Sequence, residues 1–244
     1  MTWGQVADLL APDFRIPDLP GFGRSYIPKD DADSRFSSKR AKASALVEIM
    51  KRLGHPAFFV AGRDRGSLVA FRMAMDHPAL VRKFIVMDGL PVIEHLERAD
   101  WKFARDWYHW FFFAQPKKPE RAILADPLAW YDALRPDQMG RDAYDELVTL
   151  IHDPTVIYGM VEDYRAGIRI AHRHDREDRK AGRKVRCPML CLWSLNDDLG
   201  QIYGDPIAIW KDWADNVEGC GIESGHHVAE ENPAALAAAF KAFL

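Results

Sequence analysis

Hydrophobic residues along this chain occur in short apolar runs, separated by longer stretches with helical periodicity. Each run is bounded by turn-forming residues, which is typical of a buried strand. The runs lie at residues 56–61, 81–87, 187–194 and 219–222. The remaining periodic stretches predict helices at residues 37–53, 68–75, 206–214 and 233–244. Strands and helices in this alternation predict an α/β protein with a parallel sheet.

The predicted helix at residues 37–53 is amphipathic, with Lys and Arg residues on the face opposite an apolar stripe. That stripe consists of Leu46, Ile49, Met50 and Leu53. Before this helix, the sequence predicts a short helix at residues 2–10, a strand candidate at 14–17 and a turn-rich loop at 18–25. Pro17 has no backbone N–H, so it limits how fully that strand can pair.

The pattern changes after Pro91. From residue 92 to about residue 186 it is helical, rich in aromatic and charged residues, and without convincing strands. Most residues of the aromatic segment 101–113 predict a helix that is packed on all sides. The charged run at 172–186 predicts a solvated helix face or loop. We therefore expect a helical region inserted between two parts of the sheet.

Composition limits the class of protein. The 244 residues are 48% hydrophobic and 28% charged, as expected for a globular protein of one domain, or of one domain with an insertion. A net charge of −3 gives no reason to expect a nucleic acid or a membrane as partner. Three cysteines without metal-type spacing fit a reducing cytoplasm. No apolar run approaches the ~20 residues of a membrane span, and no signal peptide is evident.

The strongest chemical signal is the segment Gly62-Arg63-Asp64-Arg65-Gly66, which joins a predicted strand to a predicted helix. Small residues two before and two after Asp64 fit a sharp strand–turn–helix elbow with Asp64 at its apex. An aspartate there can attack carbon through its carboxylate oxygen, which suits displacement of a halide or opening of an epoxide. The alternative is that Asp64 only caps the helix, which is common.

A candidate base and a candidate acid follow at the carboxyl ends of later strands, where active sites of parallel sheets lie. His226 follows the last strand and Asp88 follows the strand at 81–87. Nucleophile, acid and base therefore occur in a functional chain order. Asp198, in the loop after the strand at 187–194, is the alternative acid. Asp197 and Asp198 also fit a turn with local hydrogen bonds.

Further segments add a signal that no single motif carries. They are Gly62–Gly66, Arg72–Pro78, Asp88–Gly89, Trp107–Trp110, Gln115–Pro116, Ala125–Pro127, Asp163–Gly167 and Ser224–His226. In these segments the chain resembles the fluoroacetate (haloacetate) dehalogenases over nearly its whole length. The resemblance implies an α/β-hydrolase fold with an inserted helical cap. Residues 1–90 and 187–244 would form the core, and residues 91–186 the cap.

The resemblance also implies roles for individual residues. Asp64 corresponds to the nucleophile, Asp88 to the acid and His226 to the base that activates water. Arg65 corresponds to an arginine that holds the substrate carboxylate, for which a guanidinium is well shaped. Three cap residues correspond to donors of hydrogen bonds to the departing halide: His109, Trp110 and Tyr164. All three side chains are donors, as a poor leaving group such as fluoride requires.

The chain departs from this family at three places. Arg63 stands where the family has a histidine, and Leu68 stands where defluorinating members have a second carboxylate-binding arginine. A buried contact of that kind contributes about 1.5–3 kcal/mol. The family also has three strands before the helix at Thr2, so the resemblance implies that about 40 residues are absent here. We expect either a start site further upstream or a remnant.

Three functions remain open at this stage. The first is hydrolytic dehalogenation of a small haloacid, through an alkyl ester on Asp64. The second is an epoxide or ester hydrolase of the same fold, for which two cap tyrosines would be needed. The third is a binding protein that has lost the chemistry. None requires a metal or an organic cofactor, and the partner is a small molecule in each. The aromatic cap segment either lines a pocket or forms a homodimer interface.

Overall fold

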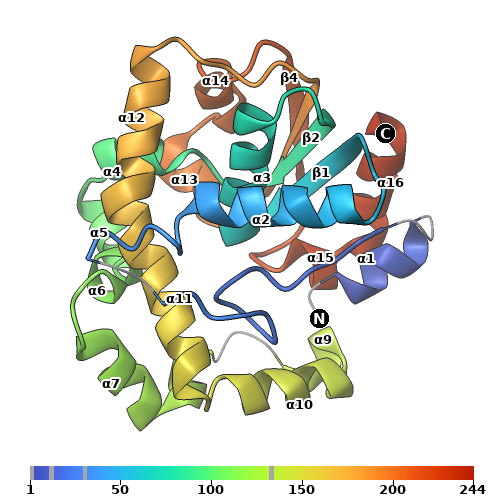
Figure 1. Cartoon of the computed structure of the whole chain (residues 1–244). Coiled ribbons are helices and arrows are strands. Elements are labelled where there is room, and N and C mark those ends of the chain that lie inside the picture. The colour runs from blue at the N-terminus through green and yellow to red at the C-terminus, as the bar shows by residue number, and fades with distance from the viewer. Residues whose placement is uncertain (1–2, 11–13, 30–31, 132–134) are drawn as a thin grey trace.

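The computed structural model describes residues 3–10, 14–29, 32–131 and 135–244. Its centre is a parallel sheet in the order β1-β2-β3-β4 (Figure 1). The strands are β1 (Phe58–Arg63), β2 (Val81–Met87), β3 (Met189–Ser194) and β4 (Val217–Ile222). The four apolar runs are therefore strands, and the predicted α/β class is confirmed. The predicted strand at residues 14–17 is wrong, because this segment pairs with none of the four strands.

Helices cover both faces of the sheet, as the alternating pattern predicts. Phe84 and Val86 of β2 pack in one apolar cluster, whereas Ile85 and Met87 pack in another. The first cluster lies under α2 (Lys39–Arg52) and α3 (Arg65–Asp76), and the second under α1 (Gly4–Leu9) and α16 (Pro233–Phe243). The other helices of the C-terminal part are α13 (Leu199–Tyr203), α14 (Pro206–Trp210) and α15 (Val228–Glu231).

The segment between β2 and β3 is helical in its described residues, and it lies at the left and bottom of the view (Figure 1). Its helices are α4 (Val92–Glu97), α5 (Trp101–Asp106), α6 (His109–Phe113), α7 (Lys118–Ala125), α8 (Pro127–Trp130), α9 (Pro136–Met139), α10 (Arg141–Leu150), α11 (Pro154–Ala166), the π-helical turn η1 (Gly167–Ala171) and α12 (His172–Lys180). The domain limits at residues 90/91 and 186/187 stay a prediction. Within the described ranges, no helix combines the length and apolar character of a membrane span.

The aromatic segment is less enclosed than predicted. It forms two short helices, α5 and α6, instead of one. Phe103 and Trp110 are buried, but Trp101 is 66% exposed. Trp107 lies between the two helices and its ring stacks on that of Trp110, with the ring centres 6.0 Å apart and the ring planes at 17°. The segment therefore presents one aromatic face to the protein and another to solvent.

The predicted polarity of two helices is partly wrong, because charged residues are buried there. In α2, Lys39 and Lys42 are buried, whereas Ile49 of the predicted apolar stripe is 47% exposed. In α12, the charged run is not simply solvated. Arg72 of α3 reaches Asp175 at 2.7 Å and Asp178 at 2.5 Å, and all three side chains are buried. Paired charges can be buried where unpaired ones cannot, and these pairs join the inserted helices to the core.

Candidate active site

Asp64 lies between β1 and α3 in a backbone conformation that non-glycine residues rarely adopt, with φ 48° and ψ −121°. Its amide donates to Met87 O at 3.0 Å, and its carbonyl accepts from Ser67 N at 3.0 Å. A sharp elbow of this kind lifts the apex side chain above the end of the strand. The predicted elbow therefore forms, and the simple helix-cap alternative is not favoured, because the Asp64 side chain makes no capping hydrogen bond.

One glycine explains how the elbow closes. A Cβ on Gly62 would lie 2.3 Å from the carbonyl oxygen of Gly66, so only glycine fits there. A Cβ on Gly66 itself would meet nothing within 4 Å among the described residues. The predicted need for small residues therefore holds at Gly62, and the position of Gly66 imposes no such requirement.

The charges around Asp64 favour its ionised form. Burial opposes ionisation, but three cationic side chains outweigh burial and lower the pKa of Asp64. They are His226, Arg63 and Arg65. The carboxylate is therefore an anion at neutral pH, which is the form that attacks carbon.

His226 lies in the loop after β4, and its partner is not the residue that the sequence predicted. Its Nδ1 lies 2.7 Å from Oδ2 of Asp197, in the loop after β3. Burial lowers the pKa of His226, but the hydrogen bond to Asp197 and the charge of Asp64 outweigh burial and raise it. The side chain is 45% exposed, so water can reach it.

Asp88 binds Ser194 and not His226, so the predicted pairing of Asp88 with His226 is wrong. Oδ1 accepts from the amide of Ser194 at 2.7 Å, and Oδ2 accepts from Ser194 Oγ at 2.9 Å. Burial raises the pKa of Asp88. Asp88 thus holds the end of β3, just before the loop that carries Asp197.

The three predicted cap donors gather around Arg65. The Arg65 guanidinium carbon lies 3.9 Å from the centre of the Tyr164 ring and 5.0 Å from that of Trp110. The His109 and Tyr164 ring centres are 5.6 Å apart. Burial lowers the pKa of His109 to about 4 and raises the pKa of Tyr164. Both side chains are therefore neutral donors at neutral pH.

Arg63 and Leu68, the two departures from the family pattern, have different surroundings. Arg63 Nη2 donates to the carbonyl of His226 and lies 3.3 Å from Nδ1 of His227, so it fixes the histidine loop. Leu68 is buried in an apolar cluster with Phe103 and Trp110. The Nη2 contacts of Arg63 are therefore with the histidine loop, and Leu68 offers no donor.

Three further residues adjoin the site without having been singled out for it. His95 of α4 is buried among aromatic rings, its Nδ1 lies 2.7 Å from the Tyr203 hydroxyl, and burial lowers its pKa to about 3. Trp107 Nε1 donates to Asp198, which joins the segment between α5 and α6 to the loop after β3. A single histidine or tryptophan within a helical pattern gives no signal for such contacts.

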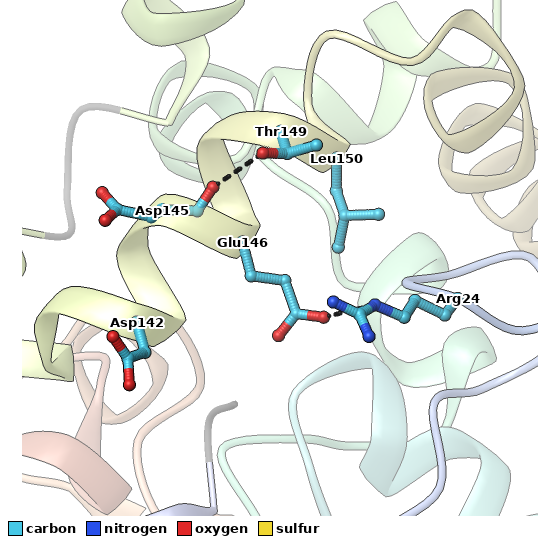
Figure 2. Close-up of a pocket in the computed structure, with 6 residues that line it drawn as sticks. All are labelled: Arg24, Asp142, Asp145, Glu146, Thr149 and Leu150. Carbon is cyan, nitrogen blue, oxygen red and sulfur yellow. Dashed lines mark hydrogen bonds and ion pairs between the residues drawn. The ribbon is translucent and has the colours of Figure 1, made fainter.

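A hollow of about 360 Å³ lies elsewhere, along α10. Figure 2 shows six residues that line it. Arg24, from the loop that precedes α2, forms an ion pair there with Glu146, with Nε 2.8 Å from Oε1. None of the predicted site residues lines this hollow. The residues that do are Arg24, Asp142, Asp145, Glu146, Thr149 and Leu150.

The sequence of residues 2–199 matches the profile of the alpha/beta hydrolase fold. The chain belongs to the α/β-hydrolase family. The strand order, the elbow and the order of Asp64, Asp197 and His226 agree with this membership. Family membership makes the chain a hydrolase of this fold, and it leaves the bond that is hydrolysed open, because many chemistries share one fold.

Similar proteins of this family differ in their activities. A fluoroacetate dehalogenase from Burkholderia sp is 33% identical over 252 residues, which cover 99% of this chain and 82% of that protein. A soluble epoxide hydrolase from Corynebacterium sp. (strain C12) is 29% identical over 95% of this chain and 81% of that protein. A solved structure from Pseudomonas aeruginosa, assigned as an epoxide hydrolase, is 36% identical with a TM-score of 0.89, covering 100% of this chain and 83% of that one.

Proposed function

We propose that this α/β hydrolase dehalogenates small haloacids through an ester on Asp64. The observation that carries the proposal is an ionised aspartate, and not a serine, at the apex of the elbow. Arg65, Trp110, Tyr164 and His109 lie close to one another, and the charges of Arg65 and Asp64 act on each other, which supports the proposal. A carboxylate nucleophile forms a stable alkyl ester only from substrates with an electrophilic sp3 carbon.

In the first step, an Asp64 oxygen attacks the carbon that bears the halogen. The new C–O bond forms as the C–halogen bond breaks, and the halide carries away the electron pair. Neutral His109, Trp110 and Tyr164 would donate hydrogen bonds to the halide, where an N–H or O–H stabilises developing negative charge. Arg65 would hold the carboxylate of the substrate.

In the second step, His226 removes a proton from water, whose oxygen attacks the ester carbonyl of Asp64. The bond between the carbonyl carbon and the alkoxide oxygen then breaks, the alkoxide takes a proton and leaves as the hydroxy acid, and the Asp64 carboxylate is restored. Asp197 accepts from Nδ1, so it fixes the tautomer in which Nε2 can take that proton. Forming the ester removes the negative charge of Asp64, one of the groups that raise the pKa of His226. The histidine therefore becomes a neutral base when the ester is present.

Epoxide hydrolysis is the second candidate, and the two epoxide-hydrolase relatives favour it. The same aspartate would attack an epoxide carbon, and a cap hydroxyl would protonate the epoxide oxygen. Tyr164 suits that role because it remains a protonated phenol. Its ring neighbours are His109 and Trp110, whose N–H groups suit a halide at least as well.

Halide release distinguishes the two candidates. Purified protein is incubated with chloroacetate, bromoacetate and fluoroacetate, and separately with styrene oxide, with an Asp64→Asn variant as control. We expect halide from the haloacids, and none from the variant. Diol formation from styrene oxide without halide release would favour the epoxide candidate. Ligand binding without turnover of any substrate would favour a binding protein.

A further inference from the structure

Arg65 has one hydrogen-bonding nitrogen left for a substrate. Its Nε donates to Asp163 Oδ2 at 2.7 Å, and its Nη2 lies 2.5 Å from the same oxygen and 3.1 Å from the Asp163 carbonyl. Nη1 is buried and has no hydrogen-bond partner among the residues that the structure describes. A carboxylate can therefore bind only the Nη1 end of Arg65, and not two guanidinium nitrogens at once as in the bidentate pair typical of arginine.

The positive charge of Arg65 is already opposed by two carboxylates. Asp163 contacts it directly and is itself buried, although it also pairs with buried Lys39 and Lys42, and Asp64 acts on Arg65 as a nearby negative charge. A substrate carboxylate would add a third negative charge beside Asp64, and like charges at close range repel. The attraction between Arg65 and an anionic substrate is therefore offset in part by this repulsion.

Leu68 adds no further attraction for an anion on this side. It is buried in a cluster with Val92, Phe103, Trp110 and Ala171, and it offers no donor. An apolar wall beside a single donor nitrogen suits a neutral carbonyl oxygen, which accepts hydrogen bonds without carrying a full charge.

We propose that the site also dehalogenates neutral α-halo amides such as chloroacetamide, because Arg65 presents only one unpaired nitrogen beside an apolar wall. This inference rests on the proposed Asp64 chemistry. The Asp64 oxygen bonds to the CH2 carbon as chloride leaves, and water then cleaves the ester. Chloroacetamide and water become glycolamide, chloride and a proton, so no oxidant or further reactant is needed.

The test compares kcat/KM for chloroacetate and chloroacetamide, measured by chloride release. The Asp64→Asn variant corrects for alkylation of exposed Cys220. We expect chloroacetate to be preferred by about tenfold, the difference between a charge-assisted and a neutral hydrogen bond. A preference above about a hundredfold, or activity on chloroacetate alone, overturns the inference and leaves the proposed function standing. No release from either substrate contradicts both.

Lys39 offers a second test, because it binds the same oxygen of Asp163 as Arg65 does. Lys39→Met removes that competing donor with little change in volume, so Asp163 would bind Arg65 more strongly. We expect the ratio of kcat/KM for chloroacetate to that for chloroacetamide to fall several-fold. Lys51→Met, on an exposed position of the same helix, should leave the ratio unchanged. An unchanged or higher ratio in Lys39→Met contradicts the proposed competition.

Discussion

The partner of His226 gives the sharpest test of the site, because the sequence and the structure point to different acids. The perturbation is a pair of matched variants, Asp197→Asn and Asp88→Asn. Asp197→Asn keeps the shape of the side chain but removes the charge that holds His226 Nδ1 at 2.7 Å. Asp88→Asn keeps an acceptor for Ser194, whose amide lies 2.7 Å from Asp88 Oδ1.

The two variants differ in expected magnitude. Loss of the acid from a buried Ser-His-Asp triad lowers kcat about 10⁴-fold. His226 is 45% exposed, so solvent weakens its attraction to Asp197. We therefore expect Asp197→Asn to lower kcat about 10²–10³-fold, or roughly 3–4 kcal/mol. Asp88→Asn should change kcat less than about threefold and lower the free energy of unfolding by about 1 kcal/mol.

The assay follows steady-state turnover together with the mass of the protein. If the second step is slowed, Asp197→Asn should accumulate the ester on Asp64 and retain a burst of halide release. Urea unfolding of both variants checks that each is folded. The reasoning is refuted if Asp88→Asn loses turnover by more than about a hundredfold while Asp197→Asn stays close to the wild type. That outcome would restore Asp88 as the acid.

Two further predictions concern proton uptake and the attachment of the inserted helices. Turnover should fall in acid, and the apparent pKa of this fall should lie below the pKa of His226 in the free protein, measured by NMR. The reason is that the ester removes the negative charge of Asp64, which raises the pKa of His226. Equal pKa values would contradict this prediction. Arg72→Met should lower the free energy of unfolding by about 3–5 kcal/mol, since it leaves buried Asp175 without its ion pair. The exposed control Arg52→Met should lower it by less than about 0.5 kcal/mol in the same urea titration.

The fold was largely predictable, because strands and helices of a parallel sheet differ in local pattern. The run at 81–87 is a strand with those bounds, and the elbow at Asp64 forms as the pattern predicts, with Gly62 as the glycine that it requires. The buried lysines of α2 were not predictable. Lys39 and its partner Asp163 are 124 residues apart, and hydrophobic periodicity treats every lysine as exposed. The same holds for Arg72 and the acids of α12.

The sequence placed Asp64 and His226 correctly, after β1 and β4, but it left the partner of His226 uncertain. Asp88 and Asp197 both follow strands, so position in the chain does not separate them. Two contacts decide which acid meets His226. Ser194 donates hydrogen bonds to both carboxylate oxygens of Asp88. The pairing of β3 with β4 brings the loop of Asp197 next to the loop of His226. Such contacts appear only when the strands are placed side by side.

The central claim is that the carboxylate of Asp64 is the nucleophile, and isotope transfer tests it most directly. The protein is allowed many turnovers of chloroacetate in water labelled with oxygen-18, and its peptides are then analysed by mass spectrometry. Hydrolysis of an ester at its carbonyl carbon transfers solvent oxygen to the aspartate, so label should appear in the peptide that contains Asp64. Labelled glycolate without any label in that peptide would mean that water attacks the substrate directly, and it would contradict the account.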